Sequence, residues 1–83
     1  MDYAIATYRS RNVTMQAYNY LIRNNVTAAI ISTPRAANVG CGLSVKFPVS
    51  AFSGVRDVLS RGETFVGFFL VKVTARGTLT TRL

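Results

Sequence analysis

Segments with the pattern of β-strands alternate with helical stretches along this chain, and their order is the strongest constraint on its fold. Four segments rich in apolar, aromatic or β-branched residues are predicted to be strands: residues 2–8, 28–33, 43–47 and 65–73. Apolar residues recur at helical spacing after Ser10 or Asn12, and the first helix is expected to end near Asn24. A second helix is predicted from Ser50, as its cap, to Gly62.

The order β-α-β-β-α-β in 83 residues predicts an α+β fold, a ferredoxin-like sandwich. We expect a four-stranded antiparallel sheet with two helices on one face. Residues 1–73 are predicted to form this single domain, and residues 74–83 a C-terminal tail or a short extra strand. Strand 65–73 is apolar on both sides except for Lys72, so the sheet face without helices is expected to be buried by a second chain, as in a homodimer.

Most catalytic chemistries lack their usual residues in this chain. Histidine is absent, Cys41 is the one cysteine, and the three acids Asp2, Asp57 and Glu63 lie far apart. Histidine-based catalysis, a disulfide within the chain, a thiolate zinc cluster and paired-carboxylate chemistry are therefore excluded or disfavoured. We predict a carrier or binding protein rather than an enzyme, with no cofactor and no metal site.

The charge and the hydropathy pattern bear on partners and location. Ten Lys and Arg against three acids give a net charge of +7, which favours an anionic partner. The longest apolar run, residues 65–71, is far shorter than the roughly 20 residues that cross a bilayer as a helix. The first residues carry Asp2 where a secretion signal carries Lys or Arg, so we expect a cytoplasmic protein without membrane association.

Cys41 lies between Gly40 and Gly42 in the connection from Pro34 to the third strand. Flanking glycines allow positive φ and bring backbone N–H groups close to a ligand or to the sulfur itself. A cysteine that serves only as a small core residue normally lies in a regular element. The pattern therefore favours an accessible thiol. The alternative is that Cys41 is buried as a small core residue.

Topology is expected to bring cations to the same edge of the sheet as this thiol. The first helix begins there, and the predicted anion-binding residues are Arg9, Arg11, Arg35 and Arg61. Helix N-termini and neighbouring cations favour the thiolate over the thiol, and the same groups bind small anions. Each arginine alone is equally consistent with solvated charge that keeps an apolar domain soluble.

The stretch from Ser32 to Phe47 resembles the selenium/sulfur carrier-like family of small domain-of-unknown-function proteins. The resemblance rests on Pro34-Arg35 followed by Cys41-Gly42-Leu43, and it extends over about residues 2–73. Gly40 stands where the family has a small hydroxyl residue. The resemblance implies that Cys41 accepts sulfur or selenium as a persulfide or selenopersulfide, that Pro34, Gly40 and Gly42 shape its loop, and that donor and acceptor proteins are the partners.

Two alternatives need no reactive thiol. Aromatic residues on an open sheet face beside basic residues could stack the bases of single-stranded RNA. The third strand, Leu43-Ser-Val-Lys-Phe47, lacks the aromatic motif of the common RNA-binding sandwich. A small regulatory module that binds an anion or metabolite between two chains is the other alternative.

Overall fold

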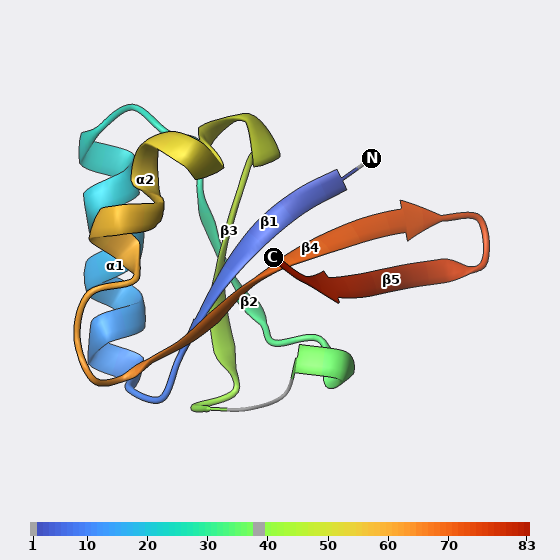
Figure 1. The fold of residues 1–83 in the computed structure, drawn as a ribbon, viewed down its shortest axis with the longest axis horizontal. Coiled ribbons are helices and arrows are strands. Elements are labelled where there is room, and N and C mark those ends of the chain that lie inside the picture. Colours follow the sequence, from blue (N-terminus) through green and yellow to red (C-terminus); the bar gives the residue numbers. More distant parts are fainter. Residues whose placement is uncertain (1, 38–39) are drawn as a thin grey trace.

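The computed structural model describes residues 2–37 and 40–83 as one sheet with both α-helices on one side (Figure 1). Within these residues the strands are β1 (Asp2–Tyr8), β2 (Ala29–Ser32), β3 (Leu43–Phe47), β4 (Phe65–Thr74) and β5 (Gly77–Arg82). The helical elements are α1 (Arg11–Arg23), α2 (Phe52–Leu59) and the 3-10 turns η1 (Arg35–Ala37) and η2 (Val49–Ala51). Neither α-helix in this part of the chain is long and apolar enough to cross a membrane.

The sheet is antiparallel and contains one strand more than predicted. Its order in the described residues is β2-β3-β1-β4-β5, with β1 in the middle. The predicted number of four strands is wrong because residues 77–82 turn back and pair with β4 from Thr74↔Gly77 to Phe69↔Arg82. The pairing of β1 with β4 starts at Asp2↔Lys72, so the end of the β4–β5 hairpin projects past β1 (Figure 1).

Local chemistry explains where the helices begin and end. The Oγ of Ser10 accepts a hydrogen bond of 3.3 Å from the N–H of Val13 and caps α1, as predicted. After Asn24, Asn25 takes a φ of 61°, a conformation that asparagine tolerates. The predicted cap at Ser50 is wrong, because the helical path already starts at Val49 as η2, after Pro48 with a φ of −64°.

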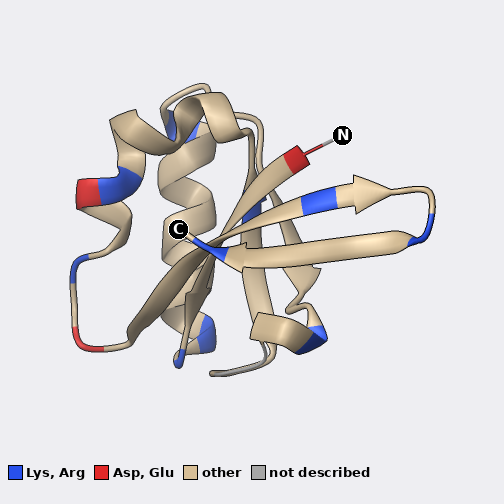
Figure 2. Cartoon of the chain, turned by 45° about the vertical axis from the view of Figure 1, so that its right-hand side comes forward, with Lys and Arg blue, Asp and Glu red and all other residues tan. Residues whose placement is uncertain are grey.

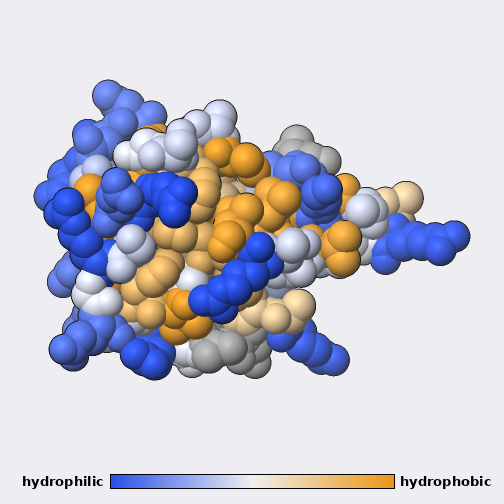
Figure 3. All heavy atoms as spheres, in the orientation of Figure 1, coloured by the Kyte–Doolittle hydropathy of each residue, from blue (hydrophilic) through white to orange (hydrophobic). Residues whose placement is uncertain are grey.

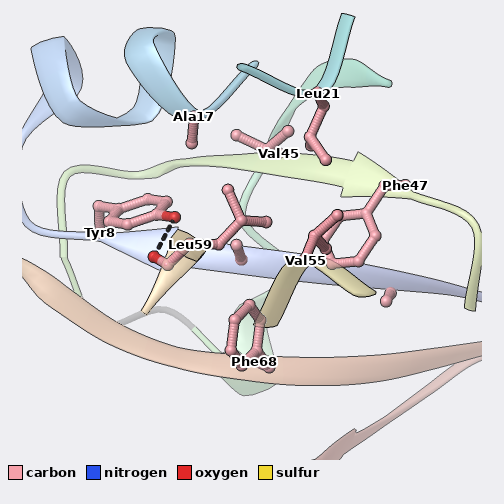
Figure 4. Close-up of a cluster of buried hydrophobic side chains, with 10 residues drawn as sticks. Tyr8, Ala17, Leu21, Val45, Phe47, Val55, Leu59 and Phe68 are labelled. Carbon is pink, nitrogen blue, oxygen red and sulfur yellow. Dashed lines mark hydrogen bonds between the residues drawn. The ribbon is translucent and has the colours of Figure 1, made fainter. Parts of the chain in front are cut away.

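The main core fills the space between the two helices and the sheet. Side chains from α1, α2, β1, β3 and β4 point toward one another there (Figure 4). Its buried members are Ala4, Ala6, Tyr8, Ala17, Leu21, Val45, Phe47, Val55, Leu59 and Phe68. Burying one large side chain such as Leu21 stabilises the fold by about 2 kcal/mol relative to leaving it exposed. This core holds both helices on the same sheet face.

The opposite sheet face is covered at its centre by the chain itself. Ile5 and Val71 are fully buried there, in a cluster with Phe69 and with Ala37 of η1. The guanidinium of Arg82 lies over the ring of Phe69, at 5.5 Å from the centroid. The broad open apolar face expected from strand 65–73 is therefore absent at this position among the described residues, and the homodimer stays a prediction without that support.

Tyr8 is a buried residue with a polar end. Its hydroxyl donates a 2.6 Å hydrogen bond to the carbonyl of Leu59, drawn as a dashed line in Figure 4. Its ring meets the ring of Phe65 edge-on, with centroids 5.7 Å apart. Burial raises the pKa of Tyr8 well above its ordinary value of 10.0, because the phenolate would lose its hydration. Tyr8 thus stays a neutral donor that ties the end of β1 to the end of α2.

The raised pKa of Tyr8 predicts a loss of stability in alkali. In the unfolded chain Tyr8 releases its proton near pH 10, whereas in the folded chain it keeps it. The unfolded state then binds fewer protons, so the free energy of unfolding decreases as the pH rises above about 10. Urea denaturation at several pH values should show that the free energy of unfolding decreases more steeply with pH for the wild type than for Tyr8→Phe. Parallel curves for the two proteins would contradict this assignment.

Candidate functional site

The loop that carries Cys41 is closed at its base by hydrogen bonds. The N–H of Thr33 donates to the carbonyl of Gly42 at 2.9 Å, which joins the end of β2 to the start of β3. Beneath this closure, the Oγ of Ser44 lies 2.8 Å from the Oγ1 of Thr33 and 3.0 Å from the Oγ1 of Thr7. Thr7 and Ser44 are fully buried, so this chain of hydroxyls fixes the base of the loop to β1. Residues 38–39 of the loop lie outside the described residues.

Backbone conformation brings the cysteine onto the end of β1. Gly40 has a φ of +126° and Gly42 a φ of +88°, values that L side chains rarely adopt. Between them, the N–H of Cys41 donates to the carbonyl of Tyr8 at 3.1 Å. A Cβ on Gly40 would collide with this same carbonyl, so glycine is required for the close approach. The predicted role of the two glycines as residues that shape the loop has this geometric basis.

The sulfur of Cys41 lies beside the first turn of α1. The side chain is partly exposed, and its Sγ is 3.7 Å from the Oγ1 of Thr14 and 3.7 Å from the carbonyl oxygen of Leu43. The hydroxyl of Thr14 also donates to the carbonyl of Ser10 at 2.9 Å. A threonine hydroxyl has one proton, so in this arrangement the thiol is the donor to Thr14 or to Leu43. When the thiol loses its proton, rotation of the Thr14 hydroxyl can supply a donor to the sulfur.

The sequence predicts that Cys41 lies near the start of the first helix, whereas Thr14 and Ser44 are not among the predicted site residues. Thr14 is fully buried, four residues after the cap Ser10, on the helix face next to the loop. A polar residue on the apolar side of a predicted helix was the available signal. Ser44 alternates with Leu43 and Val45 in β3, and it is fully buried, with its Oγ within hydrogen-bonding distance of Thr7 and Thr33.

The four predicted anion-binding arginines contact different parts of the chain. The guanidinium of Arg9 donates to the backbone carbonyl of Glu63, in the connection from α2 to β4. Arg61 lines a groove between α1 and α2, beside Tyr20. Arg35 lines a second groove against β5, and Arg11 is an exposed residue at the start of α1. Figure 2 shows Lys and Arg dispersed from the helices to the tip of the hairpin. Among the described residues, the side chain within hydrogen-bonding distance of the sulfur is that of Thr14.

Pro34 follows the closure at Thr33 and begins the turn η1, whose buried Ala37 covers the sheet. The carbonyl of Pro34 accepts a 2.9 Å hydrogen bond from the N–H of Ala37. Pro34 thus directs the chain from the edge strand β2 across the sheet face. Within residues 2–37 and 40–83, no three side chains of the metal-binding types gather at one place.

The aromatic residues are arranged as packing rather than as a platform for bases. Tyr8, Phe65 and Phe68 pack in or against the core on the helix side, and Tyr18 and Tyr20 of α1 pack against the same core. On the other face, Phe69 is buried under Arg82 and the ring of Tyr3 has the ammonium of Lys46 4.5 Å from its centroid. Base stacking on RNA needs exposed ring faces, so this arrangement gives the RNA-binding alternative little support.

Comparison with models of protein families places the chain beside a described family. A family model described as "Putative Se/S carrier protein-like" matches residues 2–66. The matched region runs from β1 into β4 and includes Pro34, Arg35 and Cys41, whereas β5 lies outside it. Neither the curated proteins nor the solved structures contain a match to this chain.

The close approach at Gly40 predicts a selective effect of alanine. Gly40→Ala forces both an unfavourable φ and a collision with Tyr8, so unfolding should become easier by about 3 to 5 kcal/mol. Gly62→Ala is the matched control, because Gly62 has a φ of +95° and open space around its Cβ position. The control should lose only about 1 to 3 kcal/mol. Equal losses in urea denaturation would show that the contact with Tyr8 is unimportant.

Proposed function

This chain belongs to the Se/S carrier protein-like family, and from that premise we propose that it carries sulfur or selenium on the Sγ of Cys41. The observation that carries the proposal is the placement of a partly exposed thiol in a loop whose backbone is fixed on both sides. The chain acts in this proposal as a carrier and not as a complete enzyme. A donor protein loads the atom and an acceptor protein removes it.

The transfer is a simple exchange at a sulfane sulfur. The Cys41 thiolate attacks the terminal sulfur of a donor persulfide, R–S–SH. One S–S bond forms at Cys41 and the S–S bond of the donor breaks, which gives Cys41–S–SH and the donor thiolate R–S⁻. The selenium version transfers SeH in place of SH. No external oxidant or reductant is needed, because the electron pair of the broken bond leaves with the donor sulfur.

Three features of the loop support this chemistry. The hydrogen bond from Cys41 N–H to the Tyr8 carbonyl and the closure at Gly42 hold the cysteine backbone in place. Partial exposure leaves room for a reactant to approach the sulfur. Thr14 is a positioning residue that can direct its hydroxyl proton to the thiolate or to the persulfide, while the positive end of α1 favours negative charge nearby.

We assign the arginines a supporting role at longer range. Arg9 and Arg11 flank the cap of α1 and raise the positive potential at this end of the molecule. Arg61 and Arg35 line other grooves, and in the proposal they contribute to recognition of donor or acceptor proteins rather than to the sulfur itself.

Loading with a small persulfide tests the carrier directly. After incubation with glutathione persulfide, the wild type should gain the mass of one sulfur atom, removable with dithiothreitol, and Cys41→Ser should not. Thr14→Val should load about fivefold more slowly because it loses one hydrogen bond to the sulfur, whereas Thr14→Ser keeps the hydroxyl and the rate. A wild-type thiol that neither loads nor reacts with iodoacetamide without denaturant would refute the carrier function.

The arginines predict selectivity for the charge of a thiol reagent. Arg11→Gln should slow the reaction of Cys41 with anionic iodoacetate and leave the reaction with neutral iodoacetamide nearly unchanged, because the lost charge steers only anions. The effect should decrease at high salt. Arg76→Gln, which removes the same charge from the exposed end of the hairpin, is the matched control. If both variants slow iodoacetate equally, Arg11 has no local role.

A further inference from the structure

Among the described residues, no strand pairs with the outer edge of β5. β5 is the last strand in the sheet order, and all but one of its residues are exposed. The N–H of Leu83 donates to the carbonyl of Phe68 at 3.0 Å. Because hydrogen-bonded pairs alternate along an antiparallel ladder, Gly77, Leu79 and Thr81 direct their backbone groups to β4. Thr78, Thr80 and Arg82 then direct theirs outward, where a further strand could pair.

A groove runs beside this edge. It has a volume of about 430 Å³ and is formed by η1 with its preceding proline on one side and β5 on the other. Its lining residues are Pro34, Arg35, Ala36, Thr78, Leu79 and Thr80. Leu79 is exposed by 58%, the largest exposed fraction among the large hydrophobic residues in the described part of the chain. The edge therefore offers main-chain groups, one exposed apolar side chain and one guanidinium close together.

The charge around the edge selects among possible occupants. Residues 65–83 contain Lys72, Arg76 and Arg82 and no Asp or Glu, and Arg35 adds a further cation in the groove. The space-filling view shows hydrophilic side chains at the projecting end of the hairpin (Figure 3). A second copy of the chain would bring another net charge of +7 to this edge, which disfavours self-pairing.

We propose that β5 is the docking edge for an extended acidic segment of a partner protein, which adds as a sixth strand. Main-chain hydrogen bonds to Thr78, Thr80 and Arg82 provide the pairing. Side chains of an added strand alternate between the two faces, so acidic residues face Arg35 and apolar residues face Leu79. An RNA strand lacks the amide groups that would pair with this edge, so a polypeptide fits it better.

This surface goes beyond the carrier proposal and does not depend on it. The matched family region ends at residue 66, before the part of β4 that pairs with β5 and before all of β5. Cys41 takes no part in the groove lining. Cys41→Ser should therefore bind the acidic segment as well as the wild type, and loss of one property leaves the other measurable.

The test uses peptides of about six residues, the usual strand length, with alternating glutamate and valine. Amide hydrogen exchange followed by NMR should slow at Thr78, Thr80 and Arg82 when this peptide is added to the intact chain. A lysine–valine peptide of the same length keeps the strand propensity with the opposite charge, and it should not bind. Slowing at other amides, or no binding of the acidic peptide, would overturn the proposal.

Two pairs of variants separate backbone pairing from charge. Thr80→Pro removes the outward N–H and should weaken peptide binding about fivefold, whereas Thr80→Val changes the side chain and keeps the N–H. Arg35→Glu should weaken peptide binding severalfold. Arg23→Glu, at the exposed end of α1, makes the same change in net charge and should leave peptide binding unchanged. The arginine pair decides the matter if the proline variant fails to fold. Three outcomes would each reject an acidic polypeptide partner. The first is an equal effect of the two glutamate substitutions, and the second is tighter binding of polyuridine at the same amides. The third is a dimer in sedimentation whose slowed amides are those of β5.

Discussion

The end of β1 is the point on which the position of the cysteine loop and the packing of α2 both depend. The carbonyl of Tyr8 accepts the N–H of Cys41, and the hydroxyl of the same residue donates to Leu59 at the end of α2. One residue therefore connects the thiol loop, the middle of the sheet and the second helix. Because Tyr8 is buried, water cannot easily replace either bond, and the loop position is coupled to the packing of the main core.

Much of the architecture was predictable because apolar periodicity reports it directly. Local patterns predict the strands before and after each helix. They also predict the cap at Ser10 and the apolar face of each helix. The fifth strand was harder to predict, because Leu79 is the one large apolar residue in Gly77–Arg82 and gives no alternating pattern. The cover of the second sheet face was also unpredictable, because Ala37 lies in a single 3-10 turn, which is too short to give a periodic signal.

The candidate site was predictable in its backbone and not in its side chains. Glycines on both sides of Cys41 indicated an unusual loop, and strand order set which end of the sheet the loop reaches. The partners of Arg9, Arg35 and Arg61 depend on long side chains with many rotamers, which a sequence does not fix. The hydroxyl partner Thr14 depends on how α1 is rotated against β3, a property of the packed core.

The hydroxyls of Thr7, Ser44 and Thr33 form a line from the buried sheet to the base of the loop. Ser44 has a single proton, so it can donate to only one of the two threonines while it accepts from the other. In that arrangement the line has a direction, and it can reverse when the hydroxyls rotate together while every heavy atom stays in place. Such lines of hydroxyls polarise cooperatively. The hydroxyl dipole of Thr33, at the end of β2, and that of Thr7, in β1, therefore reverse together.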